Sequence, residues 1–307
     1  EGIDLQSAGI AAPGVAMEFG FAREQVGNYV SFSILGLLFG AFIGGRLADR
    51  YGRKTVLLWS VAIFGVFSLA TAYAWDYSSM LTIRLLTGLG LGGTMANLIA
   101  LSSEAAPGFQ GAAVGLVYMG LPLGSVVTAL IGAAITPEQW RTVFYVGGFV
   151  PLVVVPLLAY ALPESPVFRA ASAQARVPVL DALFGGGRGL TTVLLWIGFF
   201  FVQLAIYFVI NWMPTLLRDQ GFDPAQTGVI QSLFSIGSII GTSGFGFLLD
   251  RFNRCVVAII AFVCAIAAQF SLANVAGLNP VSAAVFGAGL FLVAAQLILL
   301  STAPLCY

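Results

Sequence analysis

Long apolar runs separated by short polar stretches dominate the chain. Seven of these runs carry no charged residue and have the length of a membrane crossing: 26–45, 55–75, 111–134, 142–162, 191–217, 227–249 and 255–275. Two further runs also qualify, 78–101 with one arginine and 281–303 after a turn, whereas 5–17 is apolar but short. A hydrocarbon core of about 30 Å needs about 20 apolar residues per helix. The pattern therefore predicts nine spanning helices and one partial helix.

Composition supports this reading and narrows the possible chemistry. Charged residues make up 8% of the chain and apolar residues 59%, whereas soluble domains are about 25% charged. Histidine is absent, so any proton carrier in this sequence has to be a carboxyl group. The three cysteines form no CxxC pair, and "GLGLGG" lies inside an apolar run rather than after a strand. We expect no metal site, no disulfide and no cofactor.

Basic residues are distributed unevenly between the two sets of connectors. The set 46–54, 102–110, 163–190 and 250–254 carries Arg46, Arg50, Arg53, Lys54, Arg169, Arg176, Arg188, Arg251 and Arg254. The other set carries Arg23, Arg141 and Arg218. The positive-inside rule places the first set in the cytoplasm.

An internal repeat divides the chain into two halves. "GRLADRYGR" (45–53) and "GFLLDRFNR" (246–254) share the spacing of Gly, Asp-Arg and a later Arg, and Asn253 replaces Gly52. The connector 163–190 is polar and rich in glycine. We therefore predict a first bundle at 1–162, a cytoplasmic linker at 163–190 and a second bundle at 191–307, as in transporters with parallel repeats.

The repeated loop has two explanations. Its basic residues alone are equally well explained as topology anchors that bind lipid phosphates. Anchoring does not explain the aspartates, because a negative charge is disfavoured at the C-terminal end of a helix. We expect each aspartate to meet the N-terminus of another helix, or Arg53 or Lys54, and to form a gate, the cytoplasmic latch. Its predicted residues are Gly45, Asp49, Arg50, Gly52, Arg53, Asp250, Arg251 and Arg254.

The loop 45–54 is similar to the loop signature of the major facilitator superfamily. The segments "RLLTGLGLGG" (84–93), "MGLPLG" (119–124), Trp140-Arg141 and "LPESP" (162–166) agree with it. More narrowly, 1–13, 88–104 and "NWMPTLL" (211–217) resemble the aromatic acid:proton symporters. The resemblance implies an all-α bundle in two pseudo-repeated halves that open alternately to each side. It also implies that about ten of twelve helices are present.

Three carboxylates and one arginine are the candidates for proton coupling. Glu1 and Asp4 are three residues apart and share a helical face. On the residues alone, a solvated loop explains them equally well; the resemblance places both in the membrane, where burial favours the neutral carboxyl. Arg84 is the one cation inside a predicted span, and either a structural pair or attraction of an organic anion explains it. Glu104 completes this set.

A polar and aromatic stripe is the candidate for substrate binding. Trp196, Phe200, Gln203, Tyr207 and Asn211 recur every three or four residues and therefore share one face. Such stripes are more often packing surfaces, but the two amides favour an inward face on which a flat ring can stack. The predicted substrate residues are Trp196, Gln203, Tyr207, Asn211, Gln296 and Asn97.

Helix rise gives a rough depth for each group. At about 1.5 Å per residue, Asp4 lies about 20 Å below the outer end near Met17, and Gln203 and Gln296 lie about 21 Å and 22 Å below theirs. Arg84 lies only about 9 Å below Ser78. We therefore expect Asp4, Gln203 and Gln296 at one level, and no direct salt bridge between Asp4 and Arg84.

These observations together predict a proton-coupled secondary transporter that imports an aromatic carboxylate such as a hydroxybenzoate. The alternative is a sugar or other small-metabolite:proton symporter, because "PESP" also occurs in sugar porters. A membrane enzyme and a passive channel are disfavoured. We expect a multi-pass monomer in a bacterial inner membrane, with a small organic anion, protons and lipid as its partners and no nucleic acid.

Overall fold

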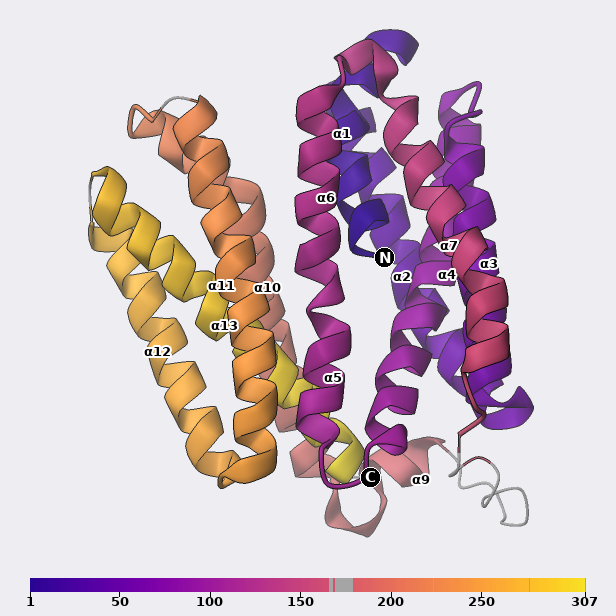
Figure 1. The fold of residues 1–307 in the computed structure, drawn as a ribbon, viewed down its shortest axis with the longest axis vertical. Coiled ribbons are helices and arrows are strands. Elements are labelled where there is room, and N and C mark those ends of the chain that lie inside the picture. Colours follow the sequence, from indigo (N-terminus) through magenta and orange to yellow (C-terminus); the bar gives the residue numbers. More distant parts are fainter. Residues whose placement is uncertain (166–167, 169–178, 223, 276, 307) are drawn as a thin grey trace. The chain divides into compact units, whose positions relative to one another are not determined.

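The computed structural model describes residues 1–165, 168, 179–222, 224–275 and 277–306, and every regular element in these ranges is a helix (Figure 1). The chain forms two compact units. The first contains Glu1–Ala105 and Leu123–Ala173, and the second contains Ala106–Pro122 and Gln174–Tyr307. Nine helices in the described ranges are long and apolar enough to cross a membrane, as the sequence predicts.

The first unit is a bundle of six helices with a short 3₁₀ turn, η1 (Pro137–Gln139). The helices are α1 (Gly2–Phe19), α2 (Arg23–Tyr51), α3 (Arg53–Thr71), α4 (Tyr77–Ala105), α6 (Gly120–Ala134) and α7 (Arg141–Ala161). Helix α4 packs against α2 and α3, while α7 packs against α1 and α3.

The second unit also consists of helices, with a short turn, η2 (Gly185–Gly187), before the first long one. Its helices are α5 (Gln110–Tyr118), α9 (Val179–Phe184), α10 (Gly189–Asp219), α11 (Pro224–Arg251), α12 (Arg254–Asn274) and α13 (Leu278–Cys306). Helix α13 packs against α10, α11 and α12, and α5 packs against α11. The apolar run 111–134, predicted as one helix, is therefore divided at Met119 into α5 and α6.

Glycines bring the central helices of each unit into close contact. A β-carbon at Gly88 or Gly92 of α4 would overlap backbone carbonyl oxygens of α2, at Ser33 and Leu37. Small residues allow this approach, which gives membrane helices their van der Waals attraction. Gly88 and Gly92 therefore serve close helix packing.

The second unit repeats this contact at equivalent positions. Gly36 and Gly40 of α2 meet the carbonyls of Leu85 and Leu89. In the same spacing, Gly237 and Gly241 of α11 meet those of Phe286 and Leu290, and Gly289 meets that of Phe234. The internal repeat therefore extends from the loop motif to the packing of the helix pairs α2–α4 and α11–α13.

The two copies of the loop motif begin their next helix differently. Gly52 has φ = +97°, and a side chain there would overlap the Glu164 carboxylate, which accepts a hydrogen bond from the backbone N–H of Lys54 (3.0 Å). Asn253, by contrast, has φ = −59°, and its own side chain accepts from the N–H of Cys255 (2.9 Å). The Gly-to-Asn difference thus reflects an external cap on α3 and a self-supplied cap on α12.

Helix α4 is capped outside its membrane-spanning part. Asp76 accepts from the N–H of Ser79 (2.7 Å), and Ser79 Oγ accepts from the N–H of Asp76 (3.1 Å). Hydrogen bonds from the side chain and from the backbone N–H of Ser79 favour the charged Asp76 carboxylate and lower its pKa. The charged cap therefore persists at neutral pH and is lost only as the pH falls through that lowered value.

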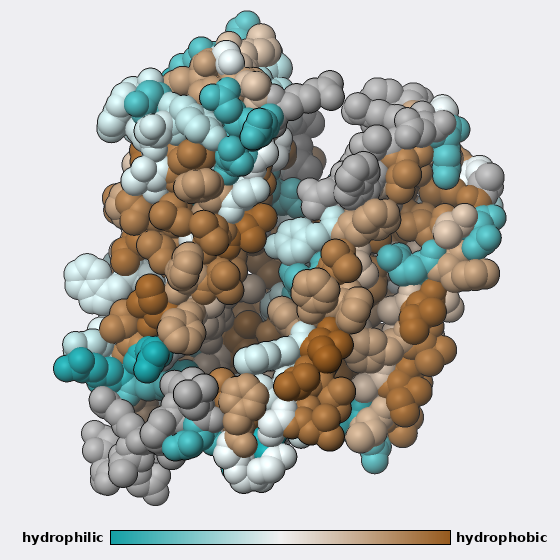
Figure 2. Space-filling view, turned by 180° about the vertical axis from the view of Figure 1, so that it is seen from behind, coloured by the Kyte–Doolittle hydropathy of each residue, from teal (hydrophilic) through white to brown (hydrophobic). Residues whose placement is uncertain are grey.

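Large apolar side chains cover much of the outer surface. Phe42, Trp59, Phe201 and Ile266 are examples that remain more than half exposed. On the face shown in Figure 2, brown side chains cover the middle of the helices and most teal ones lie near the ends. This distribution fits a protein whose solvent along its flanks is lipid.

Candidate functional site

A buried ion pair lies inside the first unit. Asp4 of α1 and Arg84 of α4 are each 1% exposed, and Arg84 NH1 lies 3.3 Å from Asp4 Oδ2. Taking such a pair out of water is expensive, and intramembrane charges usually mark functional sites.

Neutral groups from three other helices surround this pair. Ser68 of α3 donates to Asp4 Oδ1 (2.5 Å), and Ser33 of α2 accepts from Arg84 NH2 (3.1 Å). The guanidinium lies 5.6 Å from the ring centres of both Tyr29 (α2) and Phe144 (α7). The two serines therefore form hydrogen bonds with the charged groups, and the two aromatic faces attract the guanidinium of Arg84.

The prediction that Asp4 and Arg84 form no direct salt bridge was wrong. It measured each depth from the end of its own helix, as if every helix began at one level and ran straight across the membrane. A side chain at Gly14 of α1 would overlap Pro137 and Trp140, at the start of α7, so α1 continues past that level for five more residues. The offset between helices therefore differs from the one that the helix ends suggest, and the long arginine side chain reaches Asp4.

Glu1 lies just before α1, on the same helical face as Asp4. Its Oε1 atom is buried and has no hydrogen-bond partner among the described residues. Glu1 therefore makes no hydrogen bond to the ion pair, whereas Asp4 and Arg84 are in direct contact.

A second charged cluster gathers at the end of the first unit that carries the loop motif. Arg53 Nε lies 2.8 Å from Glu104 Oε1, and Arg53 NH2 lies 3.8 Å from Asp49. Ser165 Oγ donates to Glu104, and the backbone N–H of Ser165 donates to Glu164. Glu104, grouped by sequence with the proton carriers, thus lies with the residues of the predicted cytoplasmic latch.

The second loop copy holds a helix N-terminus inside the second unit. Asp250 accepts from the backbone N–H groups of Gly111 (2.8 Å) and Ala112 (2.7 Å), at the start of α5. A carboxylate is favourable there because these N–H groups lack partners within the helix. Of the two partners expected for the aspartates, Asp49 meets Arg53 and Asp250 meets a helix N-terminus.

The remaining latch residues make few side-chain contacts. Arg50 lies over the Tyr51 ring (5.3 Å), Arg251 is exposed, and a side chain at Gly45 would meet nothing within 4 Å. Arg254 NH1 is buried and has no hydrogen-bond partner among the described residues.

Two amides pair within the second unit. Gln296 of α13 donates to Gln203 of α10 (2.7 Å), so the depth estimate held for these two helices. On the same stripe, Tyr207 is partly exposed, and Trp196 lies edge-on to Phe184 of α9 (6.0 Å). The side chain of Asn211 lies outside the described residues.

Among the described residues, Asn97 forms hydrogen bonds with backbone carbonyl groups only. Its side chain is fully buried, and Nδ2 donates to the carbonyls of Gly93 (2.8 Å) and Gly44 (3.4 Å). These bonds place Asn97 in the contact between α4 and α2.

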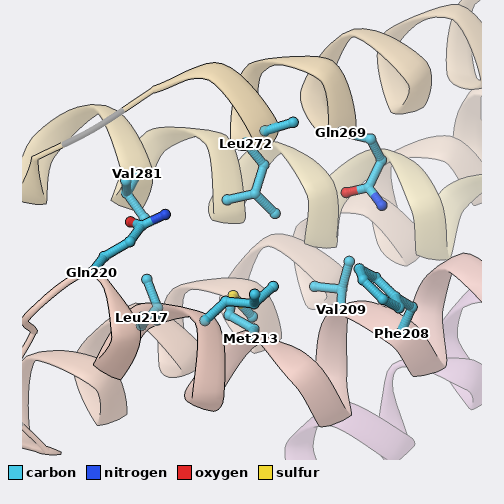
Figure 3. Close-up of a pocket in the computed structure, with 10 residues that line it drawn as sticks. Phe208, Val209, Met213, Leu217, Gln220, Gln269, Leu272 and Val281 are labelled. Carbon is cyan, nitrogen blue, oxygen red and sulfur yellow. The ribbon is translucent and has the colours of Figure 1, made fainter.

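An apolar pocket of about 280 Å³ lies between α10, α12 and α13 (Figure 3). Phe208, Val209 and Met213 of α10 line it opposite Gln269 and Leu272 of α12. By the internal repeat, α10 and α12 correspond to α1 and α3, and in the first unit α7 packs against both of these helices. The pocket therefore occupies the place that a helix fills in the other half.

Sequence reasoning missed the neutral partners of the ion pair: Tyr29, Ser33, Ser68 and Phe144. Serines and aromatic residues are common in membrane helices, so no pattern singles these out. Glu18 was missed as well; it pairs with Arg141 and accepts from Trp140 Nε1 (2.9 Å), joining α1 to α7.

Similar proteins agree with this architecture. The family model of the Major Facilitator Superfamily matches residues 1–305. The chain is 47% identical over 308 residues to the 3-(3-hydroxy-phenyl)propionate transporter of Escherichia coli K12, covering 100% of this chain and 76% of that protein. It is 34% identical over 312 residues to the 4-hydroxybenzoate transporter PcaK of Pseudomonas putida, covering 90% and 70%. A gallate transporter of the same species is 33% identical over 293 residues, covering 85% and 65%.

Solved structures show the same fold at low sequence identity. The proton:xylose symporter XylE bound to 6-bromo-6-deoxy-D-glucose superposes with a TM-score of 0.76 at 16% identity, covering 99% of this chain and 83% of that one. The human organic anion transporter MFSD10 gives a TM-score of 0.74 at 14% identity, covering 98% and 83%. The chain belongs to the Major Facilitator Superfamily and is a multi-pass membrane transporter rather than an enzyme.

Proposed function

We propose that this protein imports an aromatic carboxylate together with protons, by alternating access across a bacterial inner membrane. The observation that carries the proposal is the buried contact between Asp4 and Arg84. The named substrates of similar proteins, hydroxyphenylpropionate, hydroxybenzoate and gallate, support an aromatic acid as the substrate class.

In this mechanism Asp4 alternates between a charged and a protonated state. While Asp4 is charged, it neutralises Arg84, and an incoming anion finds no free positive charge. When Asp4 takes up a proton, Arg84 loses that neutralising partner and attracts the carboxylate of the substrate. Proton and substrate binding thereby favour each other, which is the thermodynamic requirement for symport.

Recognition of the aromatic part falls to the second unit in this proposal. The Gln203–Gln296 pair presents amide donors and acceptors, and Tyr207 on the same helix offers a ring for stacking. Asp49, Arg53 and Asp250 with their partners form the cytoplasmic latch, which breaks when the inner side opens. Latches of this kind suit switching because an ion pair or a capped helix end has two discrete arrangements.

The deciding variant is Asp4→Asn, which has nearly the same shape but cannot exchange a proton. We expect it to abolish uptake driven by a pH gradient, because Arg84 then has no partner whose charge responds to pH. The measurement is substrate-dependent proton uptake and accumulation of 3-(3-hydroxyphenyl)propionate, 4-hydroxybenzoate, gallate and a hexose in vesicles that contain the full-length protein.

Asp76→Asn is the matched control, since Asp76 is an exposed acid in a connector. It should transport normally, and both variants should reach the membrane in equal amounts. Proton-driven uptake by Asp4→Asn would remove Asp4 from the mechanism. Accumulation of the hexose instead of the aromatic acids would favour the sugar symporter.

A further inference from the structure

Asp4 has a second, uncharged partner on a different helix, Ser68 of α3. We propose that Ser68 is a positioning residue: its hydroxyl holds the Asp4 carboxyl group both when that group is charged and when it carries a proton. This inference rests on the proposed function, in which Asp4 exchanges a proton during transport.

The two oxygen atoms of Asp4 have different partners. Ser68 Oγ lies 2.5 Å from Oδ1, whereas Arg84 NH1 lies 3.3 Å from Oδ2. Hydrogen bonds from a hydroxyl to a carboxylate are typically about 2.5–2.7 Å, and those from a guanidinium about 2.7–2.9 Å. The serine contact therefore has the geometry of a full hydrogen bond, and the arginine contact is longer than usual for its type.

The hydroxyl of Ser68 and the guanidinium of Arg84 also differ in the hydrogen bonds that they can form. A guanidinium only donates hydrogen bonds, whereas a hydroxyl donates one, accepts others and rotates freely. Ser68 donates to Oδ1 while Asp4 is charged. When Oδ1 takes a proton, the new O–H group can donate to Ser68 Oγ instead. Ser68 thus stays hydrogen-bonded to Asp4 in both protonation states, whereas the electrostatic attraction between Arg84 and Asp4 is lost when Asp4 is protonated.

The other groups around Asp4 are poorly suited to hold it in both protonation states. Among the described residues, the titratable groups that face this pair are Arg84 from α4 and Tyr29 from α2; Glu1, just before α1, has no hydrogen bond to it. Helix α7 contributes Phe144 and Gly147; a β-carbon at Gly147 would lie 3.8 Å from Asp4 Oδ1 and 3.4 Å from Ser68 Oγ. Helix α7 therefore packs on this pair without a polar side chain of its own.

The test is the pH dependence of uptake by Ser68→Ala in the full-length protein. Removing a donor to the charged form favours the protonated form of Asp4, and the bond is stronger to the charged form than to the neutral one. The external pH at half-maximal uptake should therefore rise by about half to one pH unit. Ser60→Ala is the matched control, because Ser60 is buried on α3 two turns earlier and faces Gly93.

Two further variants keep the inference falsifiable if alanine impairs folding. Ser68→Thr retains the hydroxyl and should restore the pH midpoint, whereas Ser68→Cys, with a weak S–H donor, should shift it as alanine does. An unchanged midpoint in both the alanine and cysteine variants, with only a lower maximal rate, would overturn the inference and leave Ser68 a packing residue.

Proton uptake by the unaltered protein separates the two proposals. If substrate enters without protons, or Asp4→Asn still couples to them, the proposed function fails. If the protein is proton-coupled through Asp4 but the Ser68 variants keep the wild-type midpoint, only the role of Ser68 fails.

Discussion

At the scale of single residues, the geometry around Arg84 depends on the shape of its side chain as well as its charge. The planar guanidinium reaches Asp4 and Ser33 with different nitrogen atoms and lies over two rings. A lysine carries the same charge on one compact ammonium group, which cannot occupy both directions.

Arg84→Lys should therefore reduce uptake about ten- to hundredfold while keeping proton coupling, because loss of one hydrogen bond to a charged group is worth about 1.5–3 kcal/mol. Initial uptake rates at equal protein level measure the effect. Arg46→Lys is the control, since Arg46 is an exposed arginine that also lies over an aromatic ring, that of Phe42. Wild-type uptake by Arg84→Lys would show that charge alone suffices.

At the scale of elements, the contact between α2 and α4 determines how accurately the ion pair is placed. Tyr29 and Ser33 approach Arg84 from α2, and the glycines of α4 let the two backbones touch. A side chain at Gly92 would overlap the carbonyl of Leu37, so it would push α2 away from α4.

Gly92→Leu should destabilise the protein by about 1–3 kcal/mol, the usual consequence of forcing extra volume into a packed contact. Thermal unfolding in detergent measures this loss. Gly27→Leu is the matched control, because Gly27 lies on α2, the partner helix, and a β-carbon there would meet nothing within 4 Å. Equal melting temperatures for the two variants would contradict the close-packing argument.

At the scale of the whole molecule, an internal repeat and an uneven distribution of charge organise the chain. The same glycine contacts join α2 to α4 and α11 to α13. Basic residues concentrate in one set of connectors, and the positive-inside rule places that set in the cytoplasm.

Cysteine labelling tests this orientation. Cys255 is exposed next to Arg254 and should react with a membrane-impermeant maleimide only from the cytoplasmic side, in a Cys264→Ser, Cys306→Ser background. Glu138→Cys, in a connector of the other set, should react only from the opposite side once the native cysteines are removed. Labelling of Cys255 from the outside of right-side-out vesicles would contradict the predicted orientation.

The sequence by itself determined the spans, the repeat and the superfamily. Each of these is recorded locally: a spanning helix needs a continuous apolar run, and the repeat needs only two similar segments. The similar depth of Gln203 and Gln296 also followed from residue spacing, because the helix rise is constant. Their hydrogen bond was shown only by the structure.

Only the tertiary structure decided which polar groups meet. It shows that Asp4 contacts Arg84 and that Glu104 pairs with Arg53. It also shows Asn97 in the contact between α4 and α2, and Ser68 as a hydrogen-bond donor to Asp4. Such contacts depend on how far one helix is displaced along another. That displacement is fixed by packing between side chains distant in the sequence, as at Gly14 and Trp140, and no single helix contains it.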